Sequence, residues 1–182
     1  MAKVAVFLAD GFEEIEALTP VDILRRGGVD VTTVSVMGRN DINGSHGIIV
    51  QADMLLEHEN LDKVDMLILP GGKLGTQNLE ACEILKEKIR EFDAQGKYVA
   101  AICAAPTILG RMGILNGRKA TCYGGMEGEL SGADTCADPV VVDGHIITSR
   151  GMGTSMQFAL KLLEIFSDKD TADKMAAAVM VP

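Results

Sequence analysis

Tryptophan is absent from this sequence, and aromatic residues make up only 4% of its 182 positions. Because hydrophobic residues still account for 47% of the chain, the core must be built from aliphatic side chains and methionine. Long apolar runs are also missing, and none approaches the ~20 residues that a membrane-spanning helix needs. The short apolar run near the N-terminus meets acidic residues at once, which favours a first strand over a signal peptide. We therefore expect a cytoplasmic protein with no membrane partner.

Positive charge is in deficit, with 17 Lys and Arg against 26 Asp and Glu, and the formal net charge is -9. The basic residues are scattered, so no stripe is available to neutralise nucleic-acid phosphates. The four cysteines and three histidines show no metal-ligand spacing. We therefore expect reduced thiols, no metal ion and no nucleic-acid partner. The histidines lie in expected loops or hairpins, as solvated surface residues do; they are His46, His58 and His145.

Short apolar runs alternate with amphipathic segments along the chain. This alternation is typical of a parallel sheet covered by helices on both faces. We predict one α/β domain over residues 1–182, with a doubly wound, mainly parallel sheet. The expected strands are residues 3–9, 29–36, 64–72, 98–102 and 119–123, with hairpins at 45–53 and 140–149; the expected helices are residues 13–28, 78–95 and 154–166, a short one that ends near 112 and a last one from about 171.

Three of the expected strands end in tight turns, with the sequences LADGFEE, LPGG and AICAAP. In open parallel sheets, ligands bind at the carboxyl ends of the strands, near the point where the strand order reverses. We therefore expect the functional site where these three turns meet.

Cys103 follows an expected strand directly and is followed by small residues and Pro106, at the start of a helix. This arrangement is that of a nucleophile elbow, with cysteine in place of serine. The unpaired amides at a helix start favour an anion, so we expect the thiolate of Cys103 to be stabilised. The alternative is that Cys103 is a small buried hydrophobe, as most core cysteines are. The other three cysteines are expected to be structural.

Two further turns supply possible partners for this thiol. The amides of Gly71, Gly72 and Ala104 are unobstructed by large side chains and are predicted to form an oxyanion hole, although Pro-Gly-Gly is also a common plain turn. Glu16 lies one turn into the first expected helix, beside apolar residues. A partly buried carboxylate near a thiol would have a raised pKa and could share a proton with that thiol.

Four segments of the sequence carry a resemblance to a known family: DGFEEIEALTPVDILRRGG, LPGGKLGTQNL, AAICAAPTIL and TSRGMGTSMQFAL. With these segments in this order, the chain resembles the ThiJ/PfpI superfamily, in the DJ-one (parkinsonism-associated deglycase) branch, over essentially its whole length. The resemblance implies a flavodoxin-like fold. It also implies a homodimer, in which Asp22, Arg26 and the neighbouring helix match the family's dimer-forming region.

The same resemblance assigns roles to residues of the site. Cys103 matches the family's oxidisable nucleophilic cysteine, and Glu16 matches the protonated glutamate that hydrogen-bonds to it. Tyr123 and His46 occupy positions where a related protein has a histidine and an arginine near the site, so the resemblance implies that they contact substrate. The residue after the cysteine is Ala104, where the protease-like branch has a histidine, so a cysteine peptidase is disfavoured.

The resemblance therefore implies a cysteine-dependent, cofactor-independent enzyme of the glyoxalase or deglycase type. It would act on 2-oxoaldehydes such as methylglyoxal, with Cys103 as nucleophile and Glu16 as acid and base. The alternative is a redox-sensing stress protein or chaperone that uses an oxidisable Cys103. A cysteine peptidase or a thiazole-biosynthesis protein is the least favoured interpretation.

Overall fold

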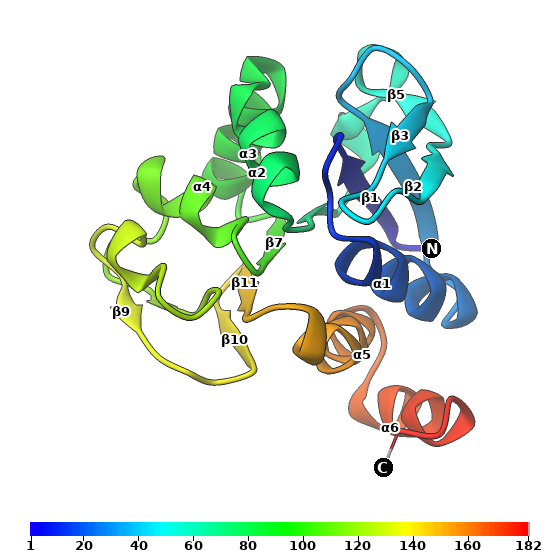
Figure 1. The fold of residues 1–182 in the computed structure, drawn as a ribbon. Coiled ribbons are helices and arrows are strands. Elements are labelled where there is room, and N and C mark those ends of the chain that lie inside the picture. Colours follow the sequence, from blue (N-terminus) through cyan, green and yellow to red (C-terminus); the bar gives the residue numbers. More distant parts are fainter. Residues whose placement is uncertain (182) are drawn as a thin grey trace.

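The computed structural model describes residues 1–181. Its centre is a seven-stranded sheet with the strand order β10-β11-β7-β6-β1-β2-β5 (Figure 1). These strands are β1 (Lys3–Leu8), β2 (Asp30–Ser35), β5 (Met54–Leu55), β6 (Met66–Leu69), β7 (Tyr98–Ile102), β10 (Val140–Asp143) and β11 (Ile146–Ser149). Every neighbouring pair is parallel except β10 with β11. The order β2-β1-β6-β7-β11 is that of a flavodoxin-like sheet, which confirms the expected fold class.

The strands are apolar on both sides because helices cover both faces of the sheet. On β1, Val4 and Val6 pack into one core cluster, while Ala5 and Phe7 point to the opposite one. One face is covered by α1 (Glu14–Arg26) and α5 (Ser155–Phe166), with α6 (Lys169–Ala178) packed outside α5 (Figure 1). The other face is covered by α2 (Lys73–Ala81), α3 (Glu83–Gln95) and α4 (Pro106–Arg111).

Two expected elements differ from the structure. The continuous helix over residues 78–95 is wrong, because α2 and α3 meet at Cys82, whose backbone is extended. The break lets α2 contact β1 while α3 contacts β7, which one straight helix would not do. The strand over residues 119–123 is also shorter than expected. Only β8 (Lys119–Ala120) forms, and it pairs with β9 (Asp134–Thr135) in a separate sheet because the chain then turns towards Cys103.

The expected excursion near residues 45–53 is a hairpin of β3 (Asp41–Asn43) and β4 (Ile49–Gln51). The remaining elements are short 3-10 helices: η1 (Leu56–His58), η2 (Leu61–Lys63), η3 (Glu127–Glu129) and η4 (Met152–Thr154).

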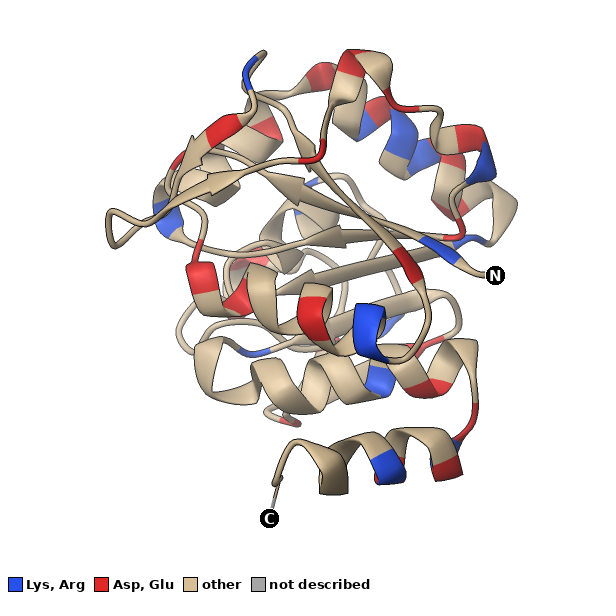
Figure 2. Cartoon of the chain, turned by 90° about the vertical axis from the view of Figure 1, so that its right-hand side faces the viewer, with Lys and Arg blue, Asp and Glu red and all other residues tan. Residues whose placement is uncertain are grey.

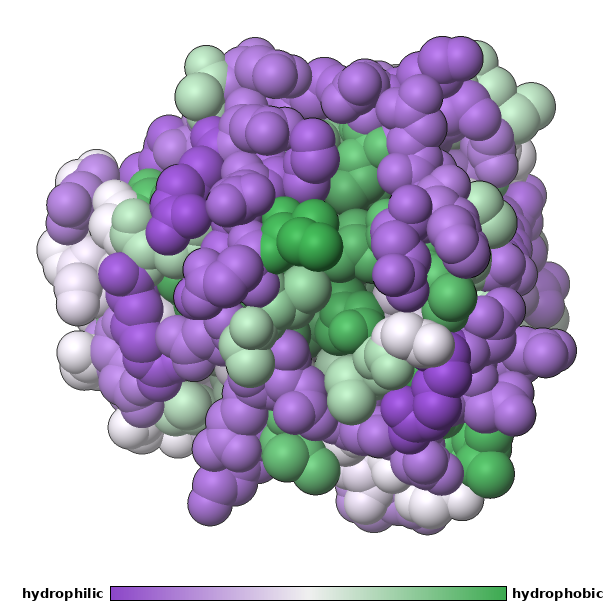
Figure 3. Space-filling view, turned by 90° about the horizontal axis from the view of Figure 1, so that it is seen from above, coloured by the Kyte–Doolittle hydropathy of each residue, from purple (hydrophilic) through white to green (hydrophobic). Residues whose placement is uncertain are grey.

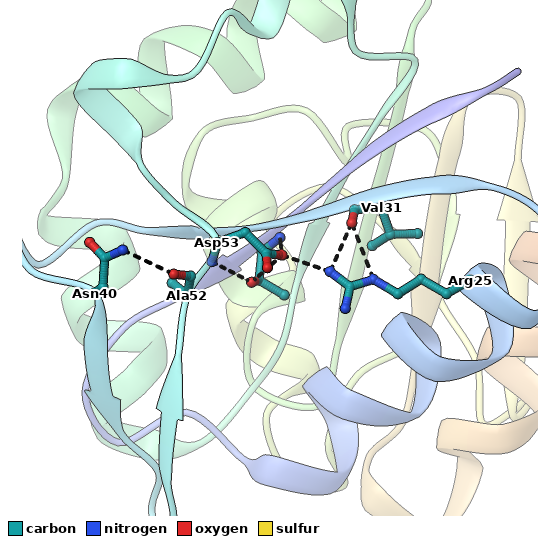
Figure 4. Close-up of polar contacts among 6 residues, drawn as sticks. Arg25, Val31, Asn40, Ala52 and Asp53 are labelled. Atoms are coloured by element: carbon teal, nitrogen blue, oxygen red, sulfur yellow. Dashed lines mark hydrogen bonds and ion pairs between the residues drawn. The ribbon is translucent and has the colours of Figure 1, made fainter.

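Asp53 ties the return of this hairpin to the sheet and to α1 (Figure 4). Its Oδ2 accepts hydrogen bonds from the backbone N–H of Thr33 (2.9 Å), the Thr33 hydroxyl (2.8 Å) and Arg25 Nη2 (2.6 Å). Arg25 Nη2 also donates to the carbonyl of Val31 at 2.9 Å. Burial alone would raise the pKa of Asp53, but these hydrogen bonds and the Arg25 charge outweigh it and hold the pKa below its ordinary value.

Lys and Arg positions are interspersed with Asp and Glu positions along the ribbon in the view of Figure 2. Seen from above, over α2, α3 and the segment from β3 to β5, apolar side chains gather in a central hollow that hydrophilic residues surround (Figure 3). Within residues 1–181, each helix is too short or too polar to cross a lipid bilayer.

We predict that Asp53→Ala lowers the free energy of unfolding by about 1 kcal/mol, because Arg25 and both Thr33 groups lose a charged acceptor that solvent partly screens. The part of this effect that depends on the charge of Asp53 should be complete above the ordinary pKa of 3.8 and be lost as the pH falls through the lower pKa of the folded state, where the protonated carboxyl still accepts hydrogen bonds. Urea denaturation at pH 7 and at pH 3 measures both. Asp41→Ala, at an exposed position of the same hairpin, is the matched control, and equal stability of the two variants at pH 7 would contradict the assignment.

Candidate active site

Cys103 occupies a sharp turn between β7 and α4. Its backbone φ is 67°, a left-handed conformation that costs a residue with a Cβ roughly 1–2 kcal/mol. Two hydrogen bonds hold the turn: the Cys103 N–H donates to the carbonyl of Ser149 (3.0 Å), and the Cys103 carbonyl accepts from the N–H of Tyr123 (2.8 Å). The geometry is therefore that of the predicted nucleophile elbow.

Glu16 reaches this elbow from α1, on the neighbouring part of the sheet edge. Only 1% of the residue is exposed, its Oε2 accepts a hydrogen bond from the N–H of Gly71 (3.0 Å), and its carboxyl hydrogen-bonds to Cys103. Burial raises the pKa of Glu16 to about 7, although these hydrogen bonds oppose the shift. The turns after β1, β6 and β7 thus meet at one point, as the sequence predicts.

The thiol of Cys103 is less acidic than the helix-start argument suggests. Burial and the negative charge of Glu16 raise the pKa of Cys103 to about 12, whereas the amides of Gly72 and Ala104 lower it. The expected stabilisation by amides is present, but burial and the neighbouring carboxylate oppose it. The two acids titrate as one unit, because a proton on Glu16 removes the repulsion that disfavours the thiolate.

The Pro-Gly-Gly turn is more than a chain reversal. A Cβ on Gly71 would lie 2.5 Å from Glu16 Oε2 and 2.6 Å from the Cβ of Cys103. Gly72 has φ of 89°, and its Cβ would lie 2.2 Å from the carbonyl oxygen of Gly11. The amide of Gly71 donates to the carboxyl of Glu16, while the amides of Gly72 and Ala104 hydrogen-bond to the sulfur of Cys103. Of the three predicted oxyanion residues, two therefore face the thiol and one faces its carboxyl partner.

A fourth segment, between β11 and α5, also contacts Cys103 and Glu16. None of its residues is among those predicted from the sequence for the site. The backbone of Met152 hydrogen-bonds to Glu16. A Cβ on Gly151 would lie 3.7 Å from Glu16 Oε1 and 3.8 Å from Cys103 Sγ. The sequence feature that could have indicated this segment is the glycine just beyond the carboxyl end of β11, which is a further parallel strand of the sheet.

A cavity of about 650 Å³ opens beside Cys103, and Tyr123 lines it. His46 does not line this cavity. It lies beyond β3, where its N–H donates to Glu14 Oε1 (2.8 Å) and its Nδ1 lies 3.1 Å from Glu14 Oε2. The buried Glu14 therefore binds His46 on the hairpin, and Glu13, whose Oε1 lies 3.6 Å from His46 Nδ1, also lines the cavity.

These contacts also change the acid–base properties of the hairpin. Burial opposes ionisation of Glu14, but hydrogen bonds from His46 and Ser45 lower the pKa of Glu14 to about 2. The hydrogen bond to Glu14 raises the pKa of His46. Within residues 1–181, Glu13, Glu14 and His46 form the one group of three such side chains whose ligand atoms, all within 4.8 Å of one another, could hold a metal ion.

The other two predicted residues lie away from the cavity. Asp22 and Arg26 form an exposed ion pair on α1, with 2.8 Å between Oδ2 and Nε. Neither residue lines the cavity beside Cys103.

A cysteine on a strand-to-helix elbow, faced by a buried carboxyl at the carboxyl ends of parallel strands, defines a cysteine-centred site on a flavodoxin-like fold. The chain belongs to the DJ-1/PfpI family, whose family model matches residues 2–165. A protein of Pyrococcus abyssi that is named a deglycase is 38% identical over 156 residues, which cover 83% of this chain and 91% of that protein.

Other relatives extend the match along the chain. Protein DJ-1 homolog B of Arabidopsis thaliana is 38% identical over 181 residues, covering 98% of this chain. The chain spans only 41% of the length of that relative. The structure of oxidized Toxoplasma gondii DJ-1 superimposes with a TM-score of 0.95 at 35% identity, covering 99% of this chain and 98% of the other.

We predict that Gly71→Ala separates Glu16 from Cys103, because the added methyl group has no room between them. Alkylation of Cys103 by iodoacetamide, followed by peptide mass spectrometry, should then become about 10- to 100-fold faster, because the charge of Glu16 that disfavours the thiolate has moved away. A change of this size is expected for a displacement of about 1 Å in a reacting pair. Gly128→Ala is the control, since a Cβ there meets nothing within 4 Å. Unchanged alkylation in the Gly71 variant would show that the close contact is not needed for reactivity.

Proposed function

We propose that this chain is a cysteine-dependent enzyme of the glyoxalase or deglycase type that acts on 2-oxoaldehydes such as methylglyoxal. The observation that carries the proposal is the buried contact between Glu16 and Cys103, of which Cys103 lines a cavity. The relative from Pyrococcus abyssi that is named a deglycase supports it. These residues require no added cofactor in the scheme below.

In the first step, the sulfur of Cys103 adds to the aldehyde carbon, and the thiol proton passes to the aldehyde oxygen. The product is a hemithioacetal. The amides of Gly72 and Ala104, which hydrogen-bond to the sulfur, are placed to stabilise negative charge that develops beside it.

In the second step, Glu16 takes the proton from the hemithioacetal carbon and a proton is added to the neighbouring ketone oxygen, which gives an enediol. Glu16 then returns a proton to the neighbouring carbon while the first hydroxyl group loses its proton and becomes the carbonyl of a lactate thioester. Water then releases lactate and regenerates the thiol. A pKa of about 7 for Glu16 suits a group that must both accept and donate a proton near neutral pH. Tyr123 lines the cavity, and in this proposal its hydroxyl group orients the substrate.

A second candidate function is that of a redox-sensing stress protein or chaperone that uses the oxidation of Cys103. Its support is that a close structural relative was solved in an oxidized form. Burial and the charge of Glu16 disfavour the thiolate that peroxide oxidises, but a proton on Glu16 removes that repulsion and the amides of Gly72 and Ala104 favour the thiolate. A cytoplasmic location would keep the four free cysteines reduced beforehand. A peptidase function has no comparable support, because Ala104 follows the cysteine.

We also propose that the chain forms a homodimer through α1. Ile15, Asp22 and Arg26 have the spacing of one helix face, and Ile15 leaves 49% of its surface exposed. The ion pair between Asp22 and Arg26 is exposed on this face and contributes little to stability by itself. An apolar residue flanked by charged residues is the composition of a small interface with a polar rim.

The catalytic proposal predicts that purified protein converts methylglyoxal to lactate without glutathione. Cys103→Ser should abolish this activity, and Glu16→Gln should reduce it about 10²- to 10⁴-fold, because it removes the proton-transfer group. Enzymatic detection of lactate measures both, with Cys82→Ser as the control that retains the wild-type rate. Lactate formation by Cys103→Ser at the wild-type rate would contradict the proposal.

The dimer proposal predicts that size-exclusion chromatography with light scattering gives the mass of two chains. Ile15→Glu should shift the protein towards the monomer, because it buries a charge in the interface. Ile84→Glu, at a position on α3 that is 55% exposed, should leave the mass unchanged. A monomeric wild-type protein at micromolar concentration would refute the proposal.

A further inference from the structure

The segment that joins β11 to α5 places two backbone groups against the reactive pair. Gly151 comes so close that a Cβ there would lie 3.7 Å from Glu16 Oε1 and 3.8 Å from Cys103 Sγ. The next residue, Met152, hydrogen-bonds to the Glu16 carboxyl through its backbone amide. These groups act on the pair only while the segment keeps its place, so the contacts that hold the segment bear on the chemistry of the pair.

Ser149, the last residue of β11, holds the elbow and this segment at the same time. β11 is the parallel neighbour of β7, and Ser149 lies opposite Ile102 in their register (Figure 1). The carbonyl of Ser149 accepts the N–H of Cys103 at 3.0 Å, which continues the ladder by one residue. The hydroxyl of the same residue lies 2.7 Å from the hydroxyl of Thr154. One fully buried residue therefore links the thiol's turn to the segment before α5.

The hydrogen bonds of Ser149 and Thr154 form a chain. The Ser149 hydroxyl donates to the carbonyl of Pro139 at 2.8 Å, so its one proton is used and the Thr154 hydroxyl donates to Ser149 Oγ. Thr154 Oγ1 accepts the N–H of Gly151 at 3.1 Å, and the Gly151 carbonyl accepts the N–H of Thr154 at 2.8 Å. The Thr154 hydroxyl also lies 2.9 Å from the Gly151 carbonyl, but a bond there would take its proton from Ser149. With the first arrangement, every donor of the turn has an acceptor.

This use of Thr154 differs from ordinary helix capping. An N-cap side chain accepts a hydrogen bond from an N–H two or three residues further along the helix. In the part of the chain that the structure describes, no side-chain hydrogen bond of this kind caps α5. Thr154 instead accepts from Gly151, three residues earlier. Its hydroxyl therefore stabilises the turn beside the reactive pair and not the start of the helix.

We propose that Thr154 is a positioning residue that keeps the backbone amide of Met152 on the Glu16 carboxyl. Its anchor is the hydroxyl of Ser149. This inference rests on the proposed function and deepens it, because Glu16 is the acid–base group of that scheme. An amide that donates to a carboxylate favours the charged form, so this contact opposes the effect of burial on Glu16. Without the Thr154 hydroxyl, the turn is released and Glu16 keeps its proton to higher pH.

Two titratable groups act on the Glu16 carboxyl besides the backbone amides. Cys103 hydrogen-bonds to it from the elbow, and the charge of Glu13 acts on it from the N-cap of α1. A substitution at Thr154 changes neither group. A shift in the titration of Glu16 that follows from the loss of the Thr154 hydroxyl therefore reports on the turn.

Titration of the Glu16 side-chain carboxyl by carbon-13 NMR tests the inference without a substrate, with the signal assigned by its absence from Glu16→Gln. Thr154→Val keeps the shape of the side chain but removes its hydroxyl. The titration midpoint of Glu16 should then rise by about one pH unit, as expected when a hydrogen bond to a charged group is lost. Thr154→Ser restores the hydroxyl and should restore the wild-type midpoint. Ser149→Ala, which keeps its carbonyl, should also raise the midpoint.

Ser155→Ala is the matched control. It removes a buried hydroxyl at the next position, which has no hydrogen-bond partner within residues 1–181, and it should leave the midpoint of Glu16 unchanged. A wild-type midpoint in both Thr154→Val and Ser149→Ala overturns the inference. An equal rise in Ser155→Ala also overturns it, because the shift would then follow from any change in this segment.

Lactate formation from methylglyoxal separates this inference from the proposed function. If both hold, kcat/KM of Thr154→Val should be about tenfold below that of the wild type at pH values under the midpoint and should approach it at higher pH, because the carboxylate form of Glu16 starts the proton transfer. A raised midpoint with no lactate from the wild-type protein overturns the proposed function and leaves the positioning role intact. An unchanged midpoint with lactate formed does the reverse.

Discussion

The contact between the Glu16 carboxyl and the Cys103 sulfur depends on a third residue that lacks a side chain. Gly71 lies between them, donates its amide to the carboxylate and leaves no room for a Cβ. This contact joins the turns after β1, β6 and β7, and the glycine after β11 closes it from a fourth side. The register of the parallel sheet therefore sets the distance between an acid and a thiol to within the size of one methyl group.

The surrounding structure stabilises an arrangement that is unfavourable locally. A carboxyl that is almost fully covered, a thiol beside it and a left-handed residue each raise the free energy of the folded chain. Apolar strands that are buried on both faces compensate for these terms and fix the elbow through hydrogen bonds to Ser149 and Tyr123. The acid–base properties of the pair follow from this rigid, desolvated setting.

Much of this architecture can be predicted from the sequence. Alternating apolar runs and helical segments indicate the parallel sheet, and a strand that runs into Cys103 and Pro106 indicates the elbow. No glycine or proline marks the break at Cys82 in the sequence. The break accompanies the different contacts that α2 and α3 make with the sheet. The direction of Gly71's amide also has no sequence signal, since it depends on how two distant turns pack.

Side chains on the surface are harder to place than those of the pair. His46 is captured by the buried Glu14, a contact between residues that are 32 positions apart and have no periodic relation. The residues of α2 that line the cavity beside Cys103 have helical spacing in the sequence, but only the packed structure reveals that this face and residues of α4 line the same cavity. Short-range patterns thus predict elements and turns, whereas the cavity and its charges depend on tertiary packing.

The left-handed backbone at Cys103 bears on why a cysteine occupies this position. With φ of 67°, the fold would accommodate glycine there with less strain than any residue that has a Cβ. Folding therefore does not account for the side chain at this corner. Reactivity and conformational preference oppose each other at Cys103, and any replacement chosen only to relax the backbone would also remove the sulfur.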